Sequence, residues 1–189
     1  MQNRALLLAR RIVAPVLLAL TAVAGPAAGQ KVKVIHNMKW AKGKPDTVLS
    51  GINVCSTPMW KVFRMLGNPA RTERITNQPV FVWERGEVKL KVSEYTFLRG
   101  LVPNFVEVSG KAPVGDIGKT GRGLALGATL NDIRRVYGRR FPVDVDESHR
   151  VSWVSVLWKG QGTAGLDFRL NSKGQVDYIQ LLAGDCNPP

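Results

Sequence analysis

The chain is 189 residues long and carries 27 Lys and Arg against 14 Asp and Glu, which gives a formal net charge of +13. Hydrophobic residues make up 44% and charged residues 22%, a composition that suits a globular protein and excludes wholesale disorder. Two cysteines are too few for a disulfide-built miniprotein or a cysteine-rich zinc module. The length suits one domain or two small halves of a repeat.

The N-terminal residues have the order of a secretory signal peptide. Three arginines give a charged start, an apolar run follows over residues 12–24, and small residues end the segment. The apolar run is short for a membrane span, so an uncleaved anchor is the less favoured alternative. We predict cleavage after Gly29 and an exported protein, periplasmic or secreted, with no membrane span after cleavage. Removal of residues 1–29 takes away three arginines and no acid, which leaves 160 residues with a formal charge of +10.

Export gives the two cysteines a possible structural role. Cys55 and Cys186 lie near opposite ends of the exported chain, and an oxidising compartment permits them to pair. A bridge would close a loop of about 130 residues and stabilise the fold by about 5 kcal/mol in the chain-entropy model. We therefore predict a Cys55–Cys186 disulfide, with two buried free thiols as the alternative.

Two segments whose first residues are 72 positions apart share one pattern. Residues 51–67 and 123–138 both read Gly–apolar–x–apolar–small–x–Thr, followed by a helical run and a closing glycine. Thr57 and Thr129 are the predicted N-caps of these helices, and the closing glycines are their predicted C-terminal stops.

Strand patterns follow each predicted helix. Residues 80–92 predict a hairpin with one wet face, and residues 151–182 predict three further strands. The predicted fold class is α+β, with two tandem helix–helix–(three to four)-strand repeats that form an antiparallel sheet with its helices packed on one face. The predicted organisation is a signal peptide over 1–29, a basic N-terminal segment over 30–46, a first repeat over 47–110, a Gly/Pro/Lys linker over 111–122 and a second repeat over 123–189.

Four short elements of the second half follow the pattern of a known family. They are Gly127-x-Thr129, Val136-Tyr137-Gly138, the aromatic strand ending in Trp158, and Leu166-Asp167-Phe168-x-Leu170-Asn171-x-x-Gly174-x-Val176. This half resembles the SmpA/OmlA-like domain of the small lipoprotein in the β-barrel assembly machine, although this chain has no lipidation cysteine. The duplication resembles the fold of the β-lactamase inhibitory protein, in which two such units form one continuous sheet. The resemblance to the inhibitory protein implies an inhibitor of a secreted or periplasmic enzyme, and the family offers no catalytic residues to carry over.

Two motifs resemble known binding loops, but each lacks a residue that the loop requires. Residues 118–120 end like a phosphate-binding loop, but Pro113 stands where that loop requires a glycine. Residues 144–149 hold three acids and a histidine, but His149 stands where a calcium loop requires glycine. Neither His36 nor His149 lies in a recognisable nucleophile context, and a triad of residues distant in sequence stays open. We therefore expect no metal, no cofactor and no enzymatic activity.

Aromatic and basic residues are the most conspicuous candidates for binding. Trp153 and Trp158 are five residues apart on one predicted strand, so one of them faces the core and the other the open side of the sheet. An exposed tryptophan beside Arg or Lys is typical of an interface anchor, whereas coverage of both rings is the alternative. The predicted partner-binding residues are Trp83 and Trp158 as anchors, Arg85 and Lys159 as flanking charges, and Arg134 and Arg135 on the second helix.

These patterns favour an exported, non-enzymatic binding module of the bacterial envelope or extracellular space. It would use an aromatic and basic sheet face to bind a protein partner or an anionic envelope surface. An inhibitor of a secreted or periplasmic enzyme is the first alternative, and an enzyme acting on envelope polymers is the second. Nucleic acid is not expected as a partner because the compartment lacks it and no RNA- or DNA-binding motif is present. The oligomeric state is not set by these patterns.

Overall fold

The structure is a computed structural model. It describes residues 41, 44–54, 56–97, 100–138, 141, 143–147, 149–158 and 165–183. All of these residues belong to one compact unit, His36–Pro189. The predicted signal peptide, Cys55, Cys186 and Lys159 lie outside the described residues, so the cleavage site and the disulfide stay predictions, as do the domain boundaries.

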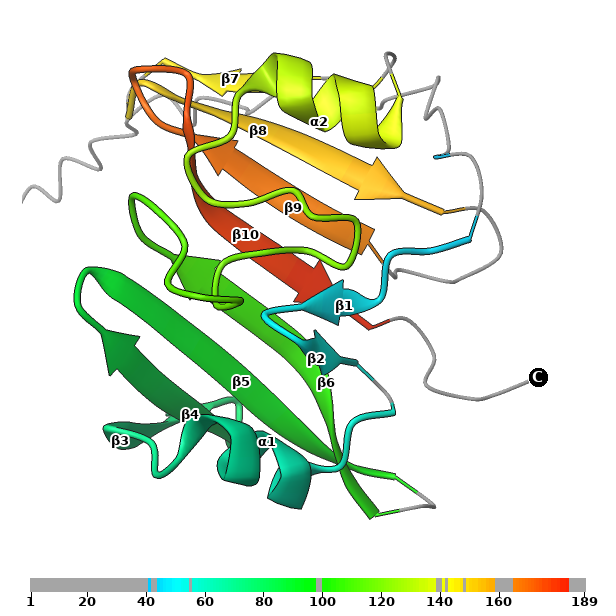
Figure 1. The fold of residues 1–189 in the computed structure, drawn as a ribbon, viewed down its shortest axis with the longest axis vertical. Helices are drawn as coiled ribbons and strands as arrows, with labels where there is room; N and C mark the ends of the chain where they lie inside the picture. The colour runs from blue at the N-terminus through cyan, green and yellow to red at the C-terminus, as the bar shows by residue number, and fades with distance from the viewer. Residues whose placement is uncertain are drawn as a thin grey trace, which may run out of the picture. The chain divides into compact units, whose positions relative to one another are not determined.

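An eight-stranded antiparallel sheet dominates the fold, with the strand order β3-β4-β5-β6-β10-β9-β8-β7 (Figure 1). Helix α1 precedes β3 to β6, helix α2 precedes β7 to β10, and β6 pairs with β10 in the middle of the sheet. A small hairpin of β1 and β2 forms a second sheet. The elements are β1 Val48–Leu49, β2 Ile52–Asn53, α1 Met59–Leu66, β3 Arg71–Ile75, β4 Gln78–Arg85, β5 Val88–Phe97, β6 Gly100–Ser109, α2 Leu130–Tyr137, β7 Val143–Asp146, β8 Val151–Leu157, β9 Gly165–Leu170 and β10 Val176–Leu182.

The predicted α+β class of tandem helix–helix–strand repeats is wrong, because the described chain is mostly β with only two short helices. Each helix has eight residues, and neither is long or apolar enough to cross a membrane. After α1, Gly67 adopts a φ of 76° and donates its backbone N–H to the Phe63 carbonyl. Strand β3 begins at Arg71, so the chain leaves no room for a second helix there.

The two helices begin differently. Thr129 caps α2 as predicted, because its side chain accepts from the Asp132 N–H while the Asp132 carboxylate accepts from the Thr129 N–H. These hydrogen bonds from Thr129 hold the pKa of Asp132 below its ordinary value. The predicted Thr57 cap of α1 is wrong: Pro58 takes the N-cap position, and the Thr57 hydroxyl accepts from the Asn53 N–H at 2.9 Å instead.

Replacement of Thr129 by alanine should lower the free energy of unfolding by about 1 kcal/mol, the usual contribution of an N-cap hydroxyl. Urea unfolding at neutral pH measures this change, and Thr129→Ser is the control because it keeps the hydroxyl. The pKa of Asp132 is lowered by folding, so the carboxylate stabilises the cap at neutral pH, and this stabilisation is lost as the pH falls through that lowered pKa. An unchanged midpoint for Thr129→Ala would contradict the capping role.

One face of the sheet is buried against the helices, the β1–β2 hairpin and residues 110–129, which we call the crossover (Figure 1). Val62 of α1 and Ile133 of α2 pack into the same core as the strands. A row of cross-strand neighbours spans six strands and is buried throughout: Trp83, Leu90, Val108, Ile179, Phe168 and Val154. The residues that alternate with this row therefore point to the opposite side of the sheet.

Candidate functional site

The opposite side of the sheet, which we call the open face, carries polar and aromatic side chains. The strand register places Lys91 beside Glu107, and it places Arg169 between Trp153 and Tyr178. The helices, the β1–β2 hairpin and the crossover all lie on the other side (Figure 1). The open face is therefore a broad surface that the described helices, hairpin and crossover do not cover. Its middle is not fully exposed, because Val80 and Val82 of β4 share this face with Lys91 and are 1% and 0% exposed.

Three residues on the open face form one packed group, which we call the aromatic–arginine cluster. Trp153 of β8 and Tyr178 of β10 meet edge to face with their ring centroids 5.5 Å apart. The guanidinium of Arg169 on β9 lies 5.9 Å from the Trp153 ring centroid and 5.3 Å from the Tyr178 ring centroid. Its Nε donates to the Asp177 carboxylate at 2.8 Å, which fixes the guanidinium over both rings.

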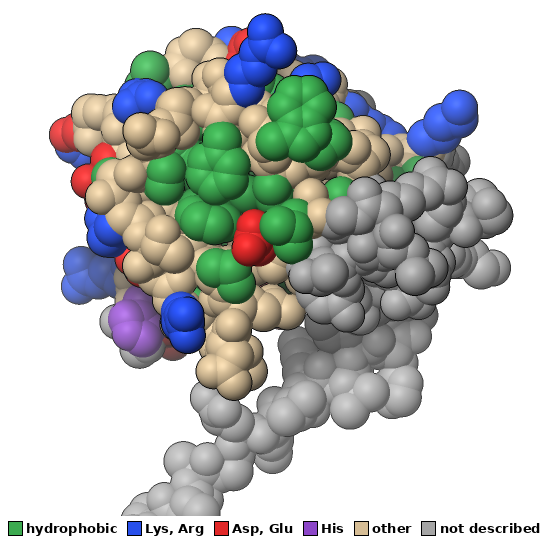
Figure 2. Space-filling view, turned by 90° about the horizontal axis from the view of Figure 1, so that it is seen from below, with side chains coloured by type: hydrophobic (Ala, Val, Ile, Leu, Met, Phe, Trp, Pro, Cys, Tyr) green, Lys and Arg blue, Asp and Glu red, His purple; other side chains and the backbone are tan. Residues whose placement is uncertain are grey.

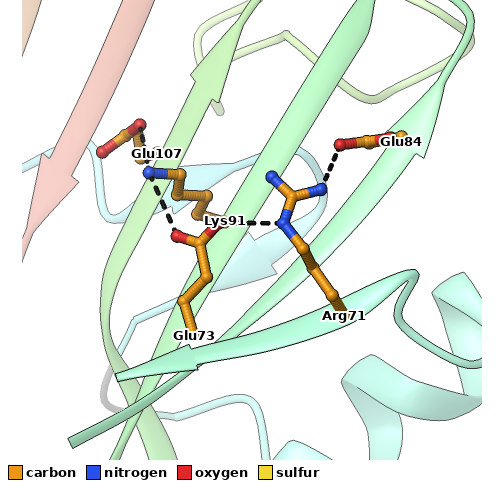
Figure 3. Close-up of polar contacts among 5 residues, drawn as sticks. All are labelled: Arg71, Glu73, Glu84, Lys91 and Glu107. Atoms are coloured by element: carbon orange, nitrogen blue, oxygen red, sulfur yellow. Dashed lines mark hydrogen bonds and ion pairs between the residues drawn. The ribbon is translucent and has the colours of Figure 1, made fainter. Parts of the chain in front are cut away.

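Charged residues of neighbouring strands form an ion-pair network next to this cluster (Figure 3). Arg71 donates to Glu84 and, through Nε at 3.0 Å, to Glu73. The Lys91 Nζ lies 3.6 Å from a Glu73 oxygen and 3.7 Å from a Glu107 oxygen. The hydrogen bond from Arg71 is the main reason why the pKa of Glu73 is lowered. Both cations of the network are therefore neutralised locally, and this part of the face is not basic.

Glu107 connects the ion-pair network with the aromatic–arginine cluster. Burial raises the pKa of the Tyr178 hydroxyl, and the neighbouring Glu107 charge raises it further. Tyr178 therefore stays protonated at any physiological pH, and its hydroxyl is hydrogen-bonded to Glu107. The combined surface offers aromatic rings and charges of both signs.

The predicted anchors Trp83 and Trp158 are not on this surface, and their assignment as surface anchors is wrong. Their side chains are 1% and 2% exposed, because both point to the helix side of the sheet. The Trp83 indole donates to the Gly67 carbonyl at 2.9 Å, and Trp158 meets the Tyr137 ring edge to face. The predicted flanking charge Arg85 donates to the Leu66 carbonyl at the end of α1, where a cation suits the helix terminus.

The expectation that the two tryptophans near β8 face opposite sides is confirmed, but Trp153 rather than Trp158 is on the open face. The alternation of the strand contains the signal that distinguishes them. Val154 and Val156 are apolar and buried, and Trp158 is two positions further on the same parity, whereas Trp153 alternates with them. Sequence patterns gave no comparable signal for Arg169 and Tyr178, since their contact depends on the pairing of β9 with β10.

Arg134 and Arg135 lie on α2, on the helix side of the sheet, so they are not part of the open face. Arg135 is exposed and pairs with Asp132 at 2.6 Å, and Arg134 is partly buried. Their role in partner binding stays a prediction.

The other candidate motifs have structural contacts. Gly118 donates its N–H to the Ser50 hydroxyl and Thr120 pairs with Leu49, so these residues tie the crossover to the β1–β2 hairpin. The Thr120 hydroxyl accepts from the Leu124 N–H within the crossover. His149 contacts Asp146 at 2.7 Å in the exposed turn between β7 and β8. The described residues contain no group of three His, Cys, Asp or Glu side chains placed to hold a metal ion.

Comparison with known proteins gives only distant structural likeness. No family model and no curated protein matches the chain. A cysteine-rich secretory protein from Staphylococcus aureus is 12% identical with a TM-score of 0.41, over 67% of this chain and 43% of its own. An extracellular protein containing an SCP domain from Bacillus anthracis is 10% identical with a TM-score of 0.45, over 80% of this chain and 51% of its own. The chain thus spans about half the length of each, and at these scores the likeness assigns no function.

The inferred resemblance to the SmpA/OmlA-like domain and to the β-lactamase inhibitory protein is therefore corrected. No family model supports it, and the described chain has one short helix before each set of four strands rather than the two helices expected in each repeat. The short Gly-x-Thr and strand motifs that suggested the family are the ordinary signals of a helix N-cap and an alternating strand, which many unrelated folds share.

Proposed function

We propose that the protein is an exported, non-enzymatic binding protein that recognises another protein through the open face of its sheet. The observation that carries this proposal is the aromatic–arginine cluster of Trp153, Arg169 and Tyr178. Trp, Tyr and Arg are the residue types that contribute most to the free energy of protein–protein binding. Here all three are partly exposed, and their mutual contacts hold them in place before a partner arrives.

The charge pattern of the open face favours a protein partner over an anionic polymer or lipid surface. Arg71, Lys91 and Arg169 each pair with a carboxylate of the same face. A polyanion would meet these carboxylates as well as the cations, so it would gain little attraction. A protein surface with charges of both signs can complement such a pattern. An inhibitor that binds a secreted enzyme would be one form of this proposal.

The enzyme alternative has less support. An enzyme acting on envelope polymers would need a histidine beside a carboxylate in a sheltered cleft. His149 lies beside Asp146, but both are in an exposed turn at the end of the β7–β8 hairpin. His36 lies outside the described residues. Export rests on the signal-peptide order of residues 1–29.

Replacement of Trp153 or Arg169 by alanine should weaken partner binding by roughly 30-fold or more, the effect of removing a hot-spot side chain. Affinity capture from envelope and culture fractions first identifies the partner, and titration of that partner then compares the variants. Both side chains are partly exposed, so thermal unfolding should stay close to that of the unchanged protein. Trp60→Ala is the matched control, because Trp60 is exposed on α1 at a distance from the open face. Equal affinity of Trp153→Ala and Trp60→Ala for the partner would refute the proposal.

A further inference from the structure

A second candidate surface lies on α1, on the opposite side of the sheet from the open face. Met59, Val62 and Leu66 point into the core and Phe63 packs against it. The other four helix positions face away from the core: Trp60, Lys61, Arg64 and Met65. Trp60 is 64% exposed and Met65 is 46% exposed, which is unusual for side chains of this size. We call the group formed by Trp60, Lys61, Arg64 and Met65, together with Pro58 before the helix, the α1 outer face.

The α1 outer face combines apolar side chains with cations that form no ion pair with any residue the structure describes. Its five residues line a surface hollow of about 610 Å³, and none of them is acidic. Within the described part of the chain, neither Lys61 nor Arg64 forms an ion pair, in contrast to the paired cations of the open face. The positive charge of this surface is therefore available to an anionic partner.

The surroundings of α1 extend the apolar character of this end of the molecule. Figure 2, which views the end formed by α1 and β3, shows hydrophobic side chains gathered together with Lys and Arg mostly around them and one acidic side chain among them. Ile75 at the end of β3 is half exposed. A large apolar surface rimmed by polar residues marks a site of protein or membrane contact.

We infer that the α1 outer face docks the protein onto an anionic lipid surface. Trp60 and Met65 would enter the headgroup region, where tryptophan is favoured because it is apolar with one polar N–H. Lys61 and Arg64 would lie at the level of the lipid phosphates, which attract basic side chains. The open face remains accessible in this orientation, because it is on the other side of the sheet, so the inference is independent of the proposed protein binding.

A lipid surface fits the geometry better than an acidic peptide does. An extended peptide needs unpaired backbone groups at a sheet edge, and a helical peptide needs a groove between elements. The hollow is lined by residues of α1 and the proline before it, so it offers neither. Its apolar groups instead project outward, as those of membrane-surface helices do.

The test measures the contact of Trp60 with lipid, because overall binding to vesicles could also come from the basic N-terminal residues. Vesicles of brominated phosphatidylglycerol quench tryptophans that enter the lipid, and the chain is used as it is recovered from the expressing cells. We expect stronger quenching for the unchanged protein than for Trp60→Phe, whereas Trp153→Phe should not alter the quenched component. Brominated phosphatidylcholine vesicles, which carry no net charge, should quench weakly.

Charge variants give the second readout. Lys61→Gln with Arg64→Gln should weaken partition onto phosphatidylglycerol vesicles roughly tenfold or more. The matched control, Lys111→Gln with Lys119→Gln, removes the same charge from residues outside α1 and should have a smaller effect. Equal quenching of Trp60→Phe and the unchanged protein, or equal partition of the two double variants, overturns the inference. Failure to bind these vesicles together with saturable binding of a Glu- and Leu-rich helical peptide overturns it in favour of a peptide site.

Discussion

Replacement of Asp46 by alanine is expected to lower the free energy of unfolding by about 3–5 kcal/mol, although Asp46 lies outside every helix and strand. Its side chain is buried, and the whole residue is 6% exposed. The carboxylate accepts from the backbone N–H groups of Gly121 at 3.1 Å and Arg122 at 3.0 Å, and from the Tyr137 hydroxyl at 2.7 Å. Its removal leaves the two backbone N–H groups without their acceptor in a place where water has little access, while Tyr137 keeps its contact with the Thr120 hydroxyl at 2.8 Å. The loss of acceptors for buried donors is costly.

Urea unfolding at neutral pH, followed by circular dichroism, measures the effect of Asp46→Ala. Asp116→Ala is the matched control, since Asp116 is exposed in the crossover and its one ion pair among the described residues is with Lys119. Its effect should stay within about 0.5 kcal/mol. Tyr137→Phe should cost about 1 kcal/mol, because it removes one donor and leaves the other contacts of the carboxylate in place. Similar midpoints for Asp46→Ala and Asp116→Ala would contradict the central role of the carboxylate.

The contacts of Asp46 join three parts of the chain that the sequence separates widely. They connect the segment before β1, the crossover and α2, with partners 75, 76 and 91 residues away. Gly121 is required by this packing, because a Cβ there would lie only 2.5 Å from an Asp46 oxygen. Burial raises the pKa of Tyr137, so its hydroxyl remains a donor. Sequence patterns predict none of this, since no local periodicity reports contacts at such separations.

Local signals predicted local structure well. The expected hairpin around Gly86 is present as β4 and β5, and Thr129 caps α2 where the pattern placed it. The predicted second helix is absent after α1, because the residues between the helix-closing glycine and the next strand are too few to form one. Only the structure shows where β3 begins. The family resemblance failed for a related reason, as motifs of three or four residues report caps and strands rather than a particular fold.

An aromatic sheet face could be expected from the sequence, but the residues that form it could not. An aromatic sheet face was expected, and the open face is aromatic, but its tryptophan is Trp153. The choice of Trp83 rested on neighbouring basic residues, and those belong to a strand end whose Arg85 binds the last turn of α1. The sheet face was also expected to be basic, but Lys91 on the open face is paired with Glu73 and Glu107 of neighbouring strands. A local sequence pattern does not show which residues become cross-strand neighbours.

Replacement of Trp83 by alanine should lower the free energy of unfolding by about 3–5 kcal/mol, the range for truncation of a large buried aromatic side chain. The ring lies in the core beside Phe63 and Phe81, with centroid distances of 5.8 Å and 6.3 Å. The substitution also removes the hydrogen bond to the Gly67 carbonyl, which holds the end of α1 against the sheet. Urea unfolding followed by circular dichroism measures the loss independently of the change in tryptophan content.

Trp60→Ala is the control for Trp83→Ala, because it removes the same side chain from an exposed position and should change the free energy of unfolding by less than about 0.5 kcal/mol. Trp83→Phe separates the two contributions of the core tryptophan, since it keeps an aromatic ring and loses the hydrogen bond to Gly67, for a cost of about 1 kcal/mol plus the smaller loss of packing. A Trp83→Ala protein that unfolds like the unchanged chain but no longer binds its partner would restore Trp83 as a surface anchor and contradict the core assignment.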